Sequence, residues 1–111
     1  MGRLERKVAA ALIRLAREVM SAETVRVKVG PPNAKEVVTA YPLELDGIRA
    51  FVFKENAPAY QRWKVHEWSS SKSLGYGPTR AEAIAAARAR IKEHGIAVVK
   101  ALIKKSPVVN Q

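Results

Sequence analysis

The chain contains no cysteine and only two histidines. Without cysteine there are no disulfide bridges, thiolate nucleophiles or cysteine-based metal centres, and the absence is compatible with a cytoplasmic protein. His66 and His94 lie far apart and form neither an H-x-x-x-H nor an H-E-x-x-H zinc-binding motif. We therefore expect no metal site and no cofactor.

Long apolar runs and catalytic motifs are missing as well. No apolar stretch reaches the length of about 18 residues that a membrane-spanning helix needs. The serines at 69–71 lack the context of a nucleophile elbow, and no phosphate-binding G-x-x-x-x-G-K-[ST] loop occurs. The sequence predicts a non-enzymatic cytoplasmic protein with no catalytic residue and no membrane partner.

Positive charge is what the chain has in excess. Its 20 Lys and Arg residues outnumber 10 Asp and Glu residues, which gives a formal net charge of +10. Such an excess attracts polyanions through long-range electrostatics and counterion release. The length of 111 residues suits a single domain with one modest core. We expect residues 1–111 to form one basic domain that binds nucleic acid; a basic domain without any polyanion partner is the alternative.

Two amphipathic patterns predict helices near the two ends of the chain. Residues 3–21 place leucines and valines on one stripe and arginines on the other side. In the second helix, over residues 79–94, Thr79 and Glu82 have the spacing of a capping box, and Gly95 is a natural C-cap. The predicted buried stripe of this helix consists of Ala83, Ile84, Ala87 and Ile91.

The sequence between these helices favours strands. Residues 24–29 alternate valines with polar residues, and Asp46-Gly47 predicts a tight hairpin between residues 43–45 and 48–53. Strands at 60–68 and 72–76 complete an antiparallel meander, because the links are too short for parallel crossovers.

Residues 33–40 carry conflicting signals. Asn33 and Glu36 have capping-box spacing and predict a short helix to about Ala40, whereas Val37–Thr39 suits a strand. The predicted fold class is α+β: an N-terminal amphipathic helix, an antiparallel sheet of three or four strands, and a helix at about 79–94 packed on one sheet face.

The best functional candidate is the segment from Gly75 to Arg80. Two glycines and Pro78 lead into a helix N-terminus, where N–H groups and a partial positive charge attract anions. Arg80 in the first turn can clamp a phosphate together with these groups. In the alternative the glycines only form the turn, Thr79 only caps the helix and Arg80 is solvated. The predicted nucleic-acid-binding residues are Lys72, Thr79, Arg80 and Arg88, followed by Arg14 and Arg17 on the first helix.

The two tryptophans lie five residues apart on one predicted strand, so Trp63 and Trp68 fall on opposite faces. An exposed Trp68 beside Lys64 could stack on a base or a sugar, as in proteins that bind single strands. In the alternative both tryptophans pack against helices.

Residues 75–87 resemble the start of the last helix of double-stranded RNA-binding domains, where the pattern G-x-G-x-[ST]-K-K-x-A-K-x-x-A-A is typical. The matching residues are Gly75, Gly77, Thr79, Arg80, Ala83 and Ala87. Ala81 and Ile84 stand where that family has basic residues, and the segment 24–41 is an addition to its order of helix, three strands and helix. The resemblance implies that Thr79 and Arg80 approach phosphates across a groove and that the first helix contacts a minor groove.

The same turn, with Thr79 followed by Glu82, Ala83 and Ile84, is similar to small sheet-plus-helix domains of mobile elements. These include integrase arm-binding domains and HicB-like antitoxins, and the resemblance implies binding to DNA or to a partner protein. The leading prediction is a nucleic-acid-binding protein that contacts mainly duplex backbone phosphates. The alternative is a small phage or plasmid protein-interaction module that docks on an acidic partner protein, with residues 96–111 as a tail or a homodimer contact.

Overall fold

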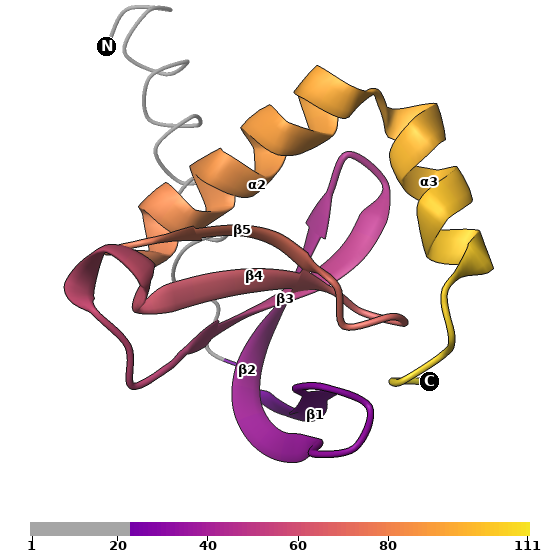
Figure 1. The fold of residues 1–111 in the computed structure, drawn as a ribbon. Helices are drawn as coiled ribbons and strands as arrows, with labels where there is room; N and C mark the ends of the chain where they lie inside the picture. Colours follow the sequence, from indigo (N-terminus) through magenta and orange to yellow (C-terminus); the bar gives the residue numbers. More distant parts are fainter. Residues whose placement is uncertain (1–22) are drawn as a thin grey trace, which may run out of the picture.

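A computed structural model describes residues 23–111, which form an antiparallel sheet covered by helices (Figure 1). The predicted helix over residues 3–21 lies outside the described residues. The described elements are β1 (Val25–Val29), β2 (Glu36–Leu45), β3 (Ile48–Lys54), η1 (Ala59–Gln61, a short 3-10 helix), β4 (Trp63–Glu67), β5 (Ser73–Gly77), α2 (Arg80–His94) and α3 (Ile96–Lys105). The α+β class is confirmed.

The sheet is a meander of five strands in the order β1-β2-β3-β4-β5, and every neighbouring pair is antiparallel. The predicted hairpin turn between β2 and β3 is confirmed: Asp46 and Gly47 have φ values of 51° and 84°, and two positive φ values in succession are what a type I′ turn requires. The expected number of three or four strands was too low, because β2 begins at Glu36 and its first half pairs with β1, which adds β1 to the sheet.

The short helix predicted from Asn33 to Ala40 is wrong, and the strand alternative is right. Val37 and Val38 lie in β2, where Val38 pairs with Val27 of β1. Pairing with β1 gives these β-branched residues cross-strand neighbours and buries Ala40 completely. An isolated capping-box spacing at the surface offers less stabilisation than this pairing, so the strand forms.

Two hydrophobic clusters lie on opposite faces of the curled sheet. The cluster beneath α2 contains Leu45, Ile48, Ala50, Val52, Val65, Leu74, Ala83, Ile84, Ala87, Ile91 and Val99. The second cluster contains Val27, Val29, Ala40, Phe51, Phe53 and Trp68. Figure 1 shows β1 and the first half of β2 lying on the side of β3 that faces away from α2. Strand β2 therefore contributes to both clusters, with Leu45 in the first and Ala40 in the second.

Helix α2 begins and ends where its capping residues predict. The Thr79 hydroxyl oxygen accepts a hydrogen bond from the Glu82 N–H at 3.2 Å, and the Gly95 N–H donates to the Ile91 carbonyl at 2.9 Å. The buried residues of the helix are Ala83, Ile84, Ala87 and Ile91, so the predicted stripe is confirmed.

The glycines of β5 let α2 lie directly on the strand. A Cβ atom built on Gly75 would stand 2.6 Å from the backbone nitrogen of Ala87, and one on Gly77 would stand 2.8 Å from that of Ala83. Both distances are far shorter than a van der Waals contact, so no larger residue fits while α2 stays in place. The glycines of the Gly75–Arg80 segment are thus explained by helix packing.

The C-terminal segment after α3 returns to the sheet and joins two distant strands. The Asn110 side-chain oxygen accepts from the Lys28 N–H at 2.9 Å, while its amide nitrogen donates to the carbonyls of Lys28 and Trp68 at 3.2 and 3.0 Å. The indole N–H of Trp68 donates to the Gln111 carbonyl at 3.2 Å. Residues 96–111 are therefore a helix followed by a packed segment, and Val99 of that helix is buried in the main cluster.

Substituting Gly75 by Ala tests the close contact between α2 and β5. We expect Gly75→Ala to destabilise the fold by about 1–3 kcal/mol, because the atoms that the new methyl group meets belong to the helix backbone and cannot rotate away. Thermal unfolding followed by circular dichroism should show a midpoint lowered by roughly 5–15 °C. The control is Ser73→Ala, at an exposed position of the same strand. Equal midpoints for the two variants would contradict this packing.

Candidate nucleic-acid interface

Arg80 does not project freely from the start of α2. Its guanidinium carbon lies 3.8 Å from the ring centre of Tyr41 on β2 and 4.9 Å from that of Trp63 on β4. The Lys54 ammonium lies 6.0 Å from the Trp63 ring. We call Arg80, Tyr41, Trp63 and Lys54 the Arg80 cluster. Stacking holds the guanidinium plane in place, and a stacked guanidinium keeps its charge and its in-plane N–H donors, the geometry that recognises phosphate.

The predicted site residues that the structure describes lie at three separate places. Lys72 directly precedes β5, whereas Thr79 and Arg80 follow its other end. Five strand residues rise by roughly 17 Å, so Lys72 and Arg80 cannot hold the same anion. Arg88 is half-buried, two turns into α2, where it lines a hollow with Asp46 and Lys92. Arg14 and Arg17 lie outside the described residues.

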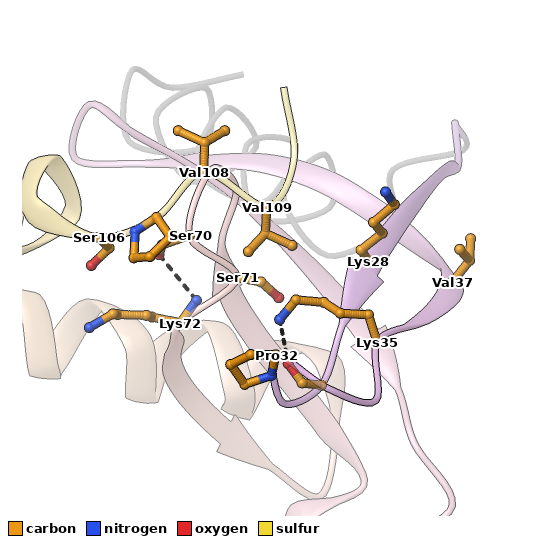
Figure 2. Close-up of a pocket in the computed structure, with 12 residues that line it drawn as sticks. Lys28, Pro32, Lys35, Val37, Ser70, Ser71, Lys72, Ser106, Val108 and Val109 are labelled. Atoms are coloured by element: carbon orange, nitrogen blue, oxygen red, sulfur yellow. Dashed lines mark hydrogen bonds between the residues drawn. The ribbon is translucent and has the colours of Figure 1, made fainter.

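Lys72 lines a cleft of about 790 Å³ that sequence reasoning did not find (Figure 2). Its walls come from the loop between β1 and β2, the turn between β4 and β5, and the segment that follows α3. We call it the lysine cleft, after Lys28, Lys35 and Lys72. The other lining residues are Gly30, Pro32, Val37, Ser70, Ser71, Ser106, Pro107, Val108 and Val109, so no carboxylate of the described residues lines it.

The lysines of the cleft are spread along it. Figure 2 shows Lys28 and Lys72 on opposite sides of the cleft, with their side chains extending in different directions and Lys35 between them. The Lys35 ammonium donates to the Gly30 carbonyl at 2.7 Å. Two of the lining serines already donate elsewhere: Ser70 to the Glu67 carboxylate at 2.6 Å and Ser106 to the Leu102 carbonyl at 2.8 Å. A ligand in the cleft therefore meets positive charge from the lysine side chains alone among the described lining residues.

The hypothesis of an exposed, base-stacking Trp68 is wrong. The opposite-face prediction holds, but Trp68 is only 9% exposed and its ring packs edge-on against Phe51 at 5.9 Å. The Arg49 guanidinium covers it at 3.7 Å from the ring centre. The alternation of β4 separates the tryptophans correctly, yet it cannot show that β1 and the C-terminal segment cover the far face. Trp63, in the Arg80 cluster, is the tryptophan that remains partly exposed.

The serine turn after β4 is structural. Glu67 is buried, and its carboxylate accepts hydrogen bonds from the backbone N–H of Ser69 at 3.0 Å and of Ser70 at 2.6 Å. The hydroxyls of both serines donate to the same carboxylate. These four donors balance the desolvated charge of Glu67 and fix the turn that carries Lys72.

His66 lies on the opposite face of β4 from Glu67, as the alternation predicts, and packs against two aromatic rings. Its ring centre is 4.9 Å from that of Phe53 and 5.7 Å from that of Phe51. Burial, reinforced by the positive charge of Lys64, lowers the pKa of His66 to about 4. His66 is therefore neutral near pH 7 and adds nothing to the positive charge of the surface.

Two further observations concern the described residues alone. Within residues 23–111, no three His, Asp or Glu side chains come close enough together to hold a metal ion. No helix in that part of the chain is both long enough and apolar enough to cross a membrane.

No protein-family model, curated protein or solved structure matches the chain significantly. The resemblances to double-stranded RNA-binding domains and to mobile-element domains therefore stay predictions that rest on residues 75–87. What the chain does must be argued from its own surface.

The lowered pKa of His66 predicts acid sensitivity. Between about pH 6.5 and pH 4 the unfolded chain binds a proton at His66 that the folded chain does not, so stability falls as the pH falls through this range. The loss should reach up to about 3 kcal/mol. Urea unfolding between about pH 5 and pH 7 measures it.

His66→Phe, which keeps an aromatic ring beside Phe51 and Phe53, should flatten this pH dependence. His94→Gln serves as the control, because His94 is exposed at the end of α2 and its loss should leave the pH dependence in place. A wild-type stability that does not change over this range would contradict the lowered pKa, because the folded protein would then bind a proton at His66 as readily as the unfolded chain does.

Proposed function

We propose that this protein is a non-enzymatic, cytoplasmic nucleic-acid-binding protein that contacts mainly the backbone phosphates of a duplex. The observation that carries the proposal is the lysine cleft, which Lys28, Lys35 and Lys72 line at separate points and which no carboxylate of residues 23–111 lines. On a chain of net charge +10, such a cleft concentrates positive potential in a concave surface.

The arrangement of the cleft suits a polymer better than a single anion. A lone phosphate is best held by donors that converge on one point, whereas the side chains of Lys28 and Lys72 extend in different directions and do not converge (Figure 2). Ammonium groups at several points along a cleft can each meet a different phosphate of one backbone. The apolar lining, with Val37, Val108 and Pro107, offers contact to the sugars between those phosphates.

The lining residues also favour a duplex over a single strand. Proteins that bind single strands without sequence preference stack the bases on aromatic side chains. No aromatic residue of the described part of the chain lines the lysine cleft, and Trp68 is packed inside the second hydrophobic cluster. Contacts with phosphates and sugars do not require unstacked bases, so an intact duplex can make all the contacts that the lining of the cleft offers.

The Arg80 cluster supplies a separate phosphate contact in this proposal. It lies at the N-terminal end of α2, where the helix dipole favours an anion. The planar guanidinium, held against Tyr41 and Trp63, would face a phosphate with its N–H edge. Its contribution is separable from that of the cleft, because the two sites lie at opposite ends of β5.

A salt titration with matched variants tests the lysine cleft. Affinity for labelled duplex DNA, duplex RNA and single strands is measured by fluorescence anisotropy at several salt concentrations. A logarithmic plot of affinity against salt should be linear, with a slope of about −0.9 for each phosphate neutralised on a DNA duplex. The combined substitution of Lys28, Lys35 and Lys72 by Gln should reduce the slope by about two to three phosphates and weaken duplex binding at least about tenfold at moderate salt.

The control is the combined substitution of Lys100, Lys104 and Lys105 by Gln, which changes the net charge equally on α3. It should lower affinity only weakly through the long-range field. The proposal fails if none of the nucleic acids binds at low salt, and the assignment to the cleft fails if the two triple variants lose the same affinity.

Arg80→Ala tests the second contact. It should reduce the magnitude of the salt slope by about one phosphate for every duplex sequence. Arg80→Lys keeps the charge but loses the planar stack, so it should retain most of the slope and still bind more weakly. Arg62→Ala, at an exposed site next to β4, is the control of equal charge. An unchanged slope in Arg80→Ala, with an unchanged melting temperature, would leave Arg80 a purely structural role.

A further inference from the structure

A second cavity, of about 270 Å³, lies where α2, α3 and the start of β5 meet. Its apolar lining consists of Leu74, Ile91, Val99, Leu102 and Ile103, its cationic lining of Lys72 and Arg90, and His94 lies beside them. We call it the α2–α3 groove. Lys72 lies between this groove and the lysine cleft and lines both.

An exposed apolar strip on α3 continues this groove. Leu102 is 55% exposed, and Val98, one turn earlier on the same helix, is 53% exposed. Residues at i and i+4 of a helix adjoin each other, so the two side chains extend the apolar surface of the groove along α3. Scattered exposed apolar residues are ordinary, but an apolar strip that leads into an apolar cavity is typical of a binding site.

The charge around the groove is positive. Arg90 and His94 are exposed on the last turns of α2, and Lys72 is exposed on the opposite wall. The lining includes one carboxylate, that of Glu67, which is only 4% exposed and accepts four hydrogen bonds from Ser69 and Ser70. A ligand in the groove therefore meets an apolar floor and cations at the rim.

The apolar floor and the positively charged rim together indicate which kind of ligand fits the groove. A symmetric contact with a second copy would place the same groove on both sides of the interface, so Lys72 and Arg90 of both copies would be brought together, and like charges repel. A nucleic-acid backbone can lay its sugars along an apolar wall, but it carries no large apolar side group that would fill a cavity between two helices. A peptide segment that alternates acidic with large apolar side chains matches both the floor and the rim.

We propose that the α2–α3 groove docks an acidic, amphipathic segment of a partner protein. A large apolar side chain of the segment fills the cavity between Leu74 and Leu102, and its Asp or Glu residues face Arg90 and Lys72. This site is distinct from the nucleic-acid surface in all its residues except Lys72, so it stands whether or not the chain binds a duplex.

Peptide selection on the full chain tests the proposal. A phage-displayed library of random peptides is panned on the folded protein at physiological salt. The selected peptides should be enriched in Asp and Glu together with Leu, Phe or Trp. One such peptide is then synthesised and its affinity for each variant is measured by fluorescence anisotropy, with circular dichroism melts to confirm that every variant is folded.

The variants separate the apolar and the electrostatic contributions. Leu102→Asp and Arg90→Glu should each weaken peptide binding at least about tenfold. The controls are Ala97→Asp, at an exposed position elsewhere on α3, and Lys104→Glu, which changes the charge as much as Arg90→Glu does. Both controls should bind within about threefold of the wild type. Replacing the acidic residue of the peptide that faces Arg90 by Lys should restore binding to Arg90→Glu.

Three results would overturn the proposal. The first is a selection that yields no enrichment of acidic apolar peptides. The second is a selected peptide that binds Leu102→Asp as tightly as it binds the wild type. The third is a peptide that loses its affinity in the Lys28 and Lys35 double variant and not in Arg90→Glu, because it would then occupy the lysine cleft. None of these results depends on nucleic-acid binding, so the two proposals can fail separately.

Discussion

Helix α2 and strand β5 meet backbone to backbone, and the rest of the described fold is arranged around this contact. Gly75 and Gly77 present no side chain to the helix, and Ala83 and Ala87 present only methyl groups to the strand. The helix is therefore held close to the sheet along its length, and Ile84 and Ile91 can fill the main cluster on either side of the contact. Because the interior between α2 and β5 is closely packed, the strand fixes the direction of the helix that lies on it.

This contact also positions both surfaces that carry the proposed functions. It places the start of α2 beside Tyr41 and Trp63, so that Arg80 can stack on them. It places the end of α2 beside Lys72 and α3, where the groove forms. The contact between α2 and β5 thus places the two ends of α2 at two different surfaces. In our proposals the surface at the start of α2 binds phosphates and the surface at its end binds a peptide.

The sequence predicted best those features that depend on neighbours along the chain. The cap at Thr79, the end of α2 at Gly95 and the turn at Asp46 and Gly47 each depend on a few adjacent residues, and all three are confirmed. Residues 33–40 failed because a local capping signal competed with pairing to β1, whose contribution cannot be seen in the segment itself. The candidate site residues show the same difference between features that depend on adjacent residues and features that depend on distant contacts. Lys72 and Arg80 are close in the sequence, but they lie at opposite ends of β5, so closeness in sequence does not bring them to one place on the surface.

The lysine cleft could not be predicted at all. Lys28, Lys72 and Val109 meet there only because the chain after α3 returns to β1, and Asn110 holds it there across a separation of 82 residues. No periodicity or motif reports such a contact. The alternation of residues 24–29 shows that Lys28 points away from the valines, but it says nothing of what lies beside it.

The bonds of Asn110 have a consequence for how this protein behaves among its own copies. Strand β1 is an edge of the sheet, and an edge with unpaired N–H and C=O groups invites another strand to pair with it. The amide of Asn110 satisfies both groups of Lys28, much as a neighbouring strand would, and leaves no room there for a foreign strand. The last residues of the chain therefore cover this edge at Lys28, and the positive charges of Arg26 and Lys28 further discourage pairing between the edge strands of two copies.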